Sequence, residues 1–282
     1  MASGPKSLTR FFSADKTIPS RTMNRLGAQV ARTVMARMMH KMRAPRAHVD
    51  TSVRDDVETL ERDGLLIIPN FLPTATVDDL RRRAEEIWSR EQKNIKVFRH
   101  GPNSLNVIAE QFAPLRPDLD AFYSDPRLPA IFEAVEHRPN TFDRRAYRAL
   151  ERLVQSGPLD VEDPETFLHS DIFFTTHKGW LYLTDVTPEC APFVFVKGSH
   201  LLSGKMLSYI YDESCRQNTG SRRISQRELD DLGLQEITLA CPRGTFVVAN
   251  TFGFHRRVRG VPGNERLGLH VSLRTNPFFS RR

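Results

Sequence analysis

The sequence predicts an α+β fold with a mainly β core that is closed or double-layered. Helix-compatible stretches dominate the first half of the chain, whereas short strand-forming runs separated by turns dominate the second half. The length of 282 residues also suits a single β-barrel domain with its surrounding helices.

The first half is expected to combine several helices with a few short strands. A charged helix at residues 53–63 leads into an apolar strand at 65–69. A turn then precedes a long charged helix that ends near residue 91, with Thr74 or Thr76 as candidate N-cap. The other elements expected here are strands at 95–98 and 105–108 and helices at 128–136 and 144–155.

Strands are expected to make up most of the second half, at residues 166–174, 179–184, 193–196, 245–250 and 267–274. The last strand is the most informative because polar and apolar side chains alternate along it. Its polar face holds Arg266, Gly268, His270 and Ser272, and its other face is apolar. Such a polar face lies toward either solvent or a barrel interior that holds a polar ligand.

The net charge of +7 is unevenly distributed. Residues 1–48 contain ten Lys or Arg and one acid, Asp15, so this segment carries +9 and the rest of the chain −2. We therefore divide the chain into a basic amphipathic N-terminal segment, residues 1–48, and one globular domain, residues 49–282. The basic isoelectric point belongs to the segment and not to the domain.

Residues 20–43 of the basic segment are expected to form one helix. Its apolar stripe consists of Met23, Leu26, Val30, Val34, Met38 and Met42. Three interpretations fit this pattern: a helix packed on the outside of the domain with a solvated basic face, an organellar transit peptide, or a basic helix that touches membrane lipid. Nucleic-acid binding is not expected, because no aromatic residues interleave with the basic ones for base stacking.

The composition predicts a cytoplasmic protein, with organellar targeting as an alternative. Apolar runs are too short to cross a bilayer, and no secretory signal is visible. The three cysteines are odd in number, widely spaced and free of any Cys-x-x-Cys pair. This pattern favours a reducing compartment over a disulfide or zinc framework.

Three residues in two places form the strongest candidate site. On a strand, His169 and Asp171 would point to the same side because they are two residues apart. His255 follows an apolar strand and a glycine, which would place it at the mouth of a barrel. Two histidines and one carboxylate bind one face of a ferrous ion and leave three coordination positions open, as in non-haem oxygenases.

Six stretches of the chain form a recognisable set. They are residues 63–72, His169-Ser170-Asp171, residues 178–186, Gly198-Ser199-His200, residues 251–257 and Asn264-Glu265-Arg266. Together they make the chain resemble the phytanoyl-CoA dioxygenase-like family of iron(II)- and 2-oxoglutarate-dependent oxygenases, from about residue 55 to the end. Two turns depart from the usual family pattern: no glycine precedes Pro192, and Lys197 stands where a proline commonly precedes Gly198.

The resemblance implies a double-stranded β-helix, the jelly-roll or cupin-like barrel, flanked by N-terminal helices. It implies that His169, Asp171 and His255 bind Fe(II), and that the Arg266 guanidinium grips the distal carboxylate of 2-oxoglutarate through two parallel bonds. The other end of the keto acid would chelate the iron, and O2 would take the remaining position. Further candidates for cofactor contact are Lys178, Trp180 and His270.

The resemblance also implies oxidation of a small organic molecule, such as a natural-product intermediate, with release of succinate and CO2. Related halogenases have a small residue where Asp171 stands, so hydroxylation is favoured. The alternatives are desaturation or ring rearrangement with the same cofactors, or a catalytically silent ligand-binding member recruited through its basic segment. Expected substrate contacts are Arg256 and Arg257, which suggest an anionic substrate, together with Asn106 and Phe173.

Overall fold

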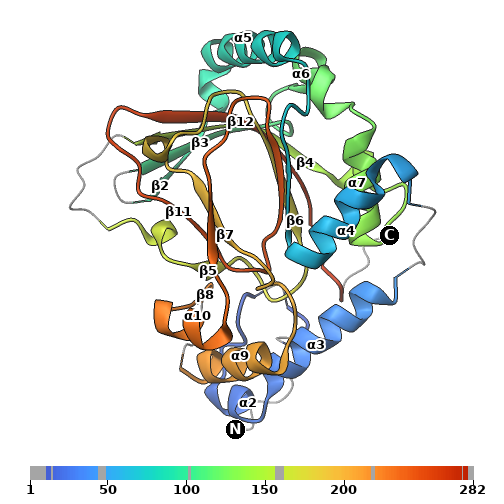
Figure 1. Ribbon diagram of the computed structural model, residues 1–282, viewed down its shortest axis with the longest axis vertical. Helices are drawn as coiled ribbons and strands as arrows, with labels where there is room; N and C mark the ends of the chain where they lie inside the picture. Colours follow the sequence, from blue (N-terminus) through green and yellow to red (C-terminus); the bar gives the residue numbers. More distant parts are fainter. Residues whose placement is uncertain are drawn as a thin grey trace, which may run out of the picture.

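The computed structural model describes residues 11–13, 15–43, 49–100, 103–155, 162–216, 220–274 and 276–278. Two antiparallel sheets face each other at its centre (Figure 1). The larger sheet consists, in spatial order, of β1 (Leu65–Ile68), β10 (Phe246–Asn250), β6 (His177–Tyr182), β12 (Glu265–Leu273), β4 (Tyr147–Gln155), β3 (Asn103–Ala109) and β2 (Lys96–His100). The smaller consists of β8 (Arg222–Arg223), β5 (His169–Ser170), β11 (His255–Arg257), β7 (Phe193–Val196) and β9 (Glu236–Leu239). The predicted jelly-roll core is confirmed.

Strand β12 lies in the middle of the large sheet, between β4 and β6. Its residues Leu267, Leu269, Val271 and Leu273 are fully buried in the main hydrophobic core. The alternate residues Arg266 and His270 face the space between the two sheets, where they lie against Tyr182 and Trp180. The alternation expected from the sequence is confirmed, and its polar face belongs to the barrel interior.

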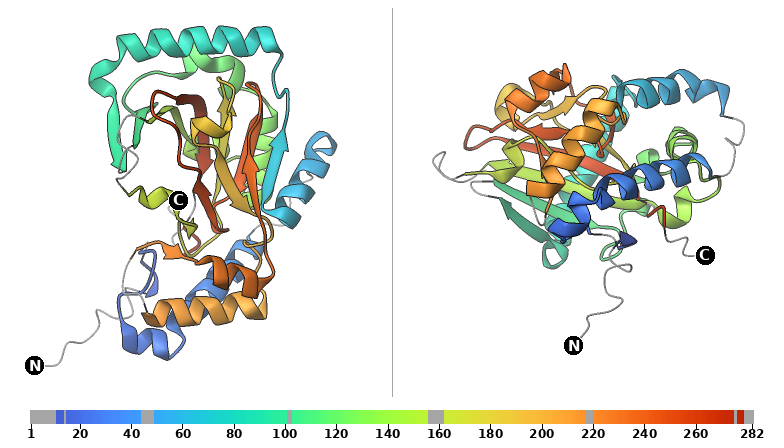
Figure 2. Two further views of the ribbon diagram at one scale, coloured as in Figure 1. Left: turned by 60° about the vertical axis from the view of Figure 1, so that its left-hand side comes forward. Right: turned by 90° about the horizontal axis from the view of Figure 1, so that it is seen from below.

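A layer of helices covers the outer face of the large sheet (Figures 1 and 2). Its members are α4 (Arg54–Asp63), α5 (Thr74–Arg90), α6 (Arg116–Tyr123), α7 (Arg127–Glu136) and the short α8 (Phe142–Arg145). The Phe246 ring of β10 anchors this layer, because its centroid lies 4.7 Å from that of Phe71 and 5.5 Å from that of Phe122. The predicted helices at 53–63, 74–91 and 128–136 are confirmed, although Pro73 rather than a threonine occupies the N-cap position of α5.

The prediction of a helix at residues 144–155 is wrong. Only Phe142–Arg145 is helical there, and Tyr147–Gln155 form strand β4 between β3 and β12. The segment is rich in Ala, Leu, Glu and Arg, which favour helix in isolation. Pairing with two neighbouring strands overrides that preference, because it satisfies both edges of β4 and buries alternate side chains on the two faces of the sheet.

Other elements also differ from expectation. Of the strand expected at 166–174, only His169–Ser170 pairs as β5, since the chain turns away at Asp171. The single helix expected at 20–43 is divided into α2 (Arg21–Arg25) and α3 (Ala28–Lys41) by Gly27, whose φ of +82° interrupts helical geometry. Elements that the sequence did not predict are α6, α9 (Gly204–Arg216), α10 (Gln226–Leu232), β8, β9 and β11.

The described part of the basic segment packs against the domain at its lower end, as Figure 1 is drawn. Asn24 of α2 donates a hydrogen bond to the Ser214 carbonyl of α9, and His40 of α3 lies 3.0 Å from the Val135 carbonyl of α7. Within the described ranges, no helix is both long and apolar enough to cross a bilayer.

Gly64 ends α4 at a φ of +76°, beside the buried His200 ring. A Cβ at position 64 would lie 2.5 Å from His200 Nδ1, and this ring is held by its Nε2, 2.9 Å from the Glu61 carbonyl. We predict that Gly64→Ala lowers the free energy of unfolding by about 3 kcal/mol, through backbone strain and overpacking together. Chemical denaturation measures this loss.

Gly233→Ala is the matched control for that prediction. Gly233 ends α10 with a φ of +70°, and no atom of the described residues lies within 4 Å of the position that a Cβ would take there. Only the backbone strain applies to this variant, so a loss of about 1 kcal/mol is expected. Equal losses for the two variants would contradict the role given to His200.

Candidate metal centre

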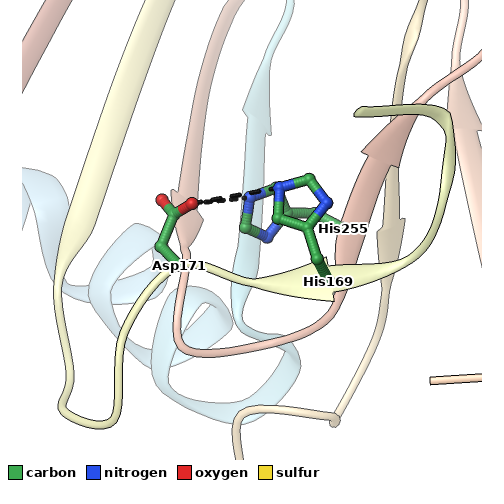
Figure 3. A group of neighbouring side chains, drawn as sticks. All are labelled: His169, Asp171 and His255. Carbon is green, nitrogen blue, oxygen red and sulfur yellow. Dashed lines mark ion pairs between the residues drawn. The ribbon is translucent and has the colours of Figure 1, made fainter. Parts of the chain in front are cut away.

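Backbone pairing in the small sheet brings the three predicted residues together. His255 of β11 is directly opposite His169 of β5, and the ring centroids lie 4.6 Å apart. Asp171 follows β5 and is fixed by a hydrogen bond from its backbone N–H to the Thr251 carbonyl. Its Oδ1 lies 4.0 Å from His169 Nε2 and 3.5 Å from His255 Nε2, so the three side chains turn toward one point (Figure 3).

The backbone also orients both imidazole rings. His169 Nδ1 lies 2.9 Å from the Phe167 carbonyl, and His255 Nδ1 lies 3.0 Å from the Gly253 carbonyl. Since a carbonyl only accepts, we assign a proton to Nδ1 of each ring. Both Nε2 atoms are then lone-pair donors aimed at the Asp171 carboxylate, an arrangement typical of metal-binding histidines.

The electrostatics favour the metal-binding form of His169 and Asp171. Burial, together with the neighbouring His255, lowers the pKa of His169 to about 4, so the ring is neutral at neutral pH. Burial alone would raise the pKa of Asp171, but the Lys178 ammonium holds that pKa well below its usual range. Lys178 Nζ lies 2.6 Å from Asp171 Oδ2, the carboxylate oxygen that does not face the two histidines.

The donor set suits a ferrous ion. The two imidazole nitrogens and one carboxylate oxygen all lie within 4.8 Å of one another, and the three residues are buried or half-buried. This two-histidine, one-carboxylate set occupies one face of an octahedral ion and leaves the opposite face for other ligands. The residues present therefore fit the metal that the sequence predicted.

The predicted cofactor residues line the interior beside the triad. Arg266 borders a narrow cavity with Trp180 and Tyr182, and its Nη1 donates to the Ala191 carbonyl at 2.7 Å. Burial raises the pKa of Tyr182 to about 12, so its phenol stays protonated. His270 is buried 5.4 Å from the Trp180 ring, and burial lowers its pKa.

Two acidic residues that the sequence did not single out also face this interior. Glu151 of β4 lines the Arg266 cavity, accepts a hydrogen bond from Trp180 Nε1 at 3.2 Å, and lies 3.7 Å from His270 Nδ1. Alternation along β4 places Glu151 on the inner face of the sheet. Because a helix was expected at residues 144–155, this position was not recognised from the sequence. Glu165, four residues before His169, places a carboxylate oxygen 3.4 Å from the Nε2 of that histidine.

Two of the four predicted substrate residues, Arg256 and Arg257, are paired with carboxylates of the protein. Arg257 forms two bonds of 3.0 Å to Asp163, which is fully buried, and Arg256 binds Glu236 at 2.6 and 2.9 Å. Both guanidinium charges are therefore neutralised within the protein. They give no support to the anionic substrate inferred from the sequence.

The other two substrate candidates lie on the outer face of the large sheet and against α3, respectively. Asn106 shares its face of β3 with Ile108, which packs in the outer core, whereas the alternate residues Leu105 and Val107 lie on the inner face. Phe173 is fully buried between the Arg32 guanidinium, 3.8 Å from its ring centroid, and the Phe278 ring. Its contacts fasten α3 to the loop after Asp171.

Comparison with known proteins gives a consistent result. The sequence signature of the family described as Phytanoyl-CoA dioxygenase (PhyH) matches residues 60–255. No curated protein sequence matches the chain. The fold resembles that of several solved structures, which at their low sequence identity establishes a shared architecture.

Three of these structures illustrate the resemblance. The non-heme alpha ketoglutarate dependent epimerase SnoN from nogalamycin biosynthesis is 18% identical with a TM-score of 0.54, over 80% of this chain and 86% of that one. The carbocyclase SnoK from the same biosynthesis is 17% identical with a TM-score of 0.51, over 81% and 86%. EctD from S. alaskensis, solved with 2-oxoglutarate and 5-hydroxyectoine, is 14% identical with a TM-score of 0.56, over 88% and 86%.

We predict that the Arg257–Asp163 pair is a structural element. Arg257→Met would leave the Asp163 carboxylate buried without its partner, and should lower the free energy of unfolding by about 3 kcal/mol. The double variant Asp163→Asn/Arg257→Met should recover part of this loss, because the buried charge is removed as well. Denaturant titration of the variants measures both effects.

The neighbouring Arg256→Met serves as control. Its pair with Glu236 is more exposed, so its loss should cost less than about 1 kcal/mol. If Arg257→Met is as stable as the native protein, the structural assignment of the pair is wrong.

Proposed function

The chain belongs to the phytanoyl-CoA dioxygenase family of iron(II)- and 2-oxoglutarate-dependent oxygenases, and we propose that its reaction is the hydroxylation of a small organic molecule. One observation carries this proposal. The ligand atoms of His169, His255 and Asp171 all lie within 4.8 Å of one another, close enough to bind one metal ion. These three side chains would hold the iron. With iron and 2-oxoglutarate bound, O2 would be the oxidant: one of its oxygen atoms would enter the substrate and the other succinate, and the keto acid would leave as succinate and CO2.

The carboxylate supports hydroxylation over halogenation. A halide on the metal needs a coordination position that no protein carboxylate fills, and Asp171 stands at that position. Lys178 supports the same assignment, since its ammonium holds the carboxylate ionised and in place at 2.6 Å. Asp171 would thus remain an anionic ligand throughout turnover.

We propose that the distal carboxylate of 2-oxoglutarate binds Arg266. The guanidinium lines the interior cavity with the Tyr182 phenol, a protonated group that can donate a second hydrogen bond. Trp180 and His270 would form the wall of this site. Glu151 would orient both of them, because it accepts from the indole and faces the His270 ring.

The substrate would enter the remaining space on the open face of the metal. Neither Arg256 nor Arg257 is available to it, since each guanidinium is paired with a carboxylate of the protein. The three cysteines are free thiols, which agrees with a reducing compartment. We propose the cytoplasm on that basis.

We predict that anaerobic Fe(II) and 2-oxoglutarate give the native protein a charge-transfer absorbance in the visible range. His169→Ala should abolish the band, because a metal ligand is removed. Arg266→Met should raise the 2-oxoglutarate concentration at half-saturation by roughly 10- to 100-fold, the effect of losing a charge-assisted hydrogen-bonded pair. A spectrophotometric titration measures both quantities.

Arg256→Met is the matched control, since it removes an arginine of the same region that lies outside the proposed cofactor site. It should give the native band and the native half-saturation. A full band in His169→Ala would refute the proposed ligand set, and native half-saturation in Arg266→Met would refute the proposed carboxylate site.

We predict that, with isotopically labelled O2, the oxidised product gains one labelled oxygen atom and succinate gains the other. Mass spectrometry of both products distinguishes the alternatives. Desaturation lowers the mass of the product by two hydrogens and adds no oxygen. A rearrangement or epimerisation incorporates no labelled oxygen into the product, whether or not the mass of the product changes. Either of these results, with succinate formed in equal amount, would replace hydroxylation as the assigned reaction.

A further inference from the structure

Helix α3 is packed with its polar side inward. The buried residues on its inner face include Gln29, Arg32, Thr33 and His40, each exposed by 5% or less. Arg32 bonds to the backbone carbonyls of Asp15 and Lys16 and to Gln29, and Thr33 donates to the Gln29 carbonyl. Each of these four side chains has at least one hydrogen-bond partner within the protein, so hydrogen bonds rather than burial of an apolar stripe hold this orientation.

The apolar side of α3 consequently faces outward. Leu26, just before the helix, is 83% exposed, Met38 is 57% exposed, and Met42, just after it, is 79% exposed. With α9 the helix borders a shallow depression of about 820 Å³, lined by Val30, Val34, Met35, Met39, Leu207 and Tyr211 among others and, within the described residues, by no charged side chain. We call these residues, with Leu26, Met38 and Met42, the methionine patch.

Positive charge surrounds the methionine patch. From Lys16 to Val49 the sequence contains no Asp or Glu, and Arg21, Arg25 and Lys41 are exposed at the two ends of the α2–α3 pair. On α9 the exposed acid Asp212 is accompanied by the exposed cation Lys205, whereas Arg216 is paired with Glu228 of α10 at 2.7 Å. An exposed apolar face with a cationic rim is the composition of helices that lie in the plane of an anionic membrane surface.

We propose that the methionine patch docks the protein onto a bilayer that contains anionic lipids. Leu26, Met38 and Met42 insert among the acyl chains near the headgroup boundary, and Arg21, Arg25 and Lys41 contact the lipid phosphates. Helix α3, about 21 Å long at its 14 residues, lies parallel to the membrane plane. Figure 2 shows α3 and α9 side by side at one end of the molecule, where both can meet a flat surface.

The charge pattern favours a lipid surface over a second copy of the chain. A two-fold dimer through this patch would set the same cations against each other, which opposes association. The most exposed apolar residues stand near the two ends of α3, and the depression between α3 and α9 is shallow. A partner helix would instead need a groove that accepts a row of its apolar side chains.

Vesicle co-sedimentation with the protein of residues 1–282 tests this proposal. Because the assay measures binding and not catalysis, its result is independent of the assigned reaction. The native protein should bind vesicles of phosphatidylcholine with phosphatidylglycerol, and bind pure phosphatidylcholine vesicles much less. The triple variant Leu26→Gln/Met38→Gln/Met42→Gln keeps every charge. It should lower the partition coefficient for the anionic vesicles about tenfold or more, since three inserted side chains become polar.

Val261→Gln is the matched control, because Val261 is 47% exposed on a loop between β11 and β12, outside the patch. It should bind as the native protein does, and thermal unfolding should show that all variants are folded. Two results would overturn the proposal: absence of native binding to the anionic vesicles, or undiminished binding by the triple variant. A native dimer in light scattering that the triple variant dissociates would also overturn it, and would assign the patch to a second copy.

Discussion

The antiparallel pairing of β11 with β5 is the constraint on which the site depends. It sets His255 directly opposite His169 in the small sheet, although the two histidines are far apart in the sequence. A shift of either strand by one residue would turn its histidine to the other face of the sheet. The bond from Asp171 N–H to the Thr251 carbonyl continues the same contact beyond β5 and brings the carboxylate to the two rings.

The large sheet separates two kinds of interaction: apolar packing on its outer face and polar contacts on its inner face. Its outer face supplies apolar burial under α4 to α7, which dominates the stability of the domain. Its inner face is therefore free to carry Arg266, Lys178, Trp180 and His270, whose polar groups would be costly in an apolar core. Three of these four residues have a partner in the interior: a backbone carbonyl for Arg266, Asp171 for Lys178 and Glu151 for the Trp180 indole.

Local patterns in the sequence were sufficient to single out the triad as a candidate site and to predict the two faces of β12, where alternation has a fixed meaning on a strand. They failed where distant partners decide the outcome. Tyr147–Gln155 became a strand because β3 and β12 flank it, and Glu151 was missed with it. Nothing near Arg256 and Arg257 in the sequence reveals that Glu236 and Asp163 pair with them, because these acids are distant in the chain.

The inverted packing of α3 has the same physical origin as the position of Asp171. Residues 172–175 leave β5 after Asp171, and α3 holds this loop through three contacts. The Arg32 guanidinium stacks on Phe173, Arg37 donates to Thr175 Oγ1 at 2.6 Å, and Ala36 packs among Ile172, Phe173 and Phe174. Because the polar face of α3 is needed to support the loop that carries the candidate iron-binding carboxylate, its apolar face is left to the solvent side. The methionine patch and the support of the loop after Asp171 are thus two consequences of one helix orientation.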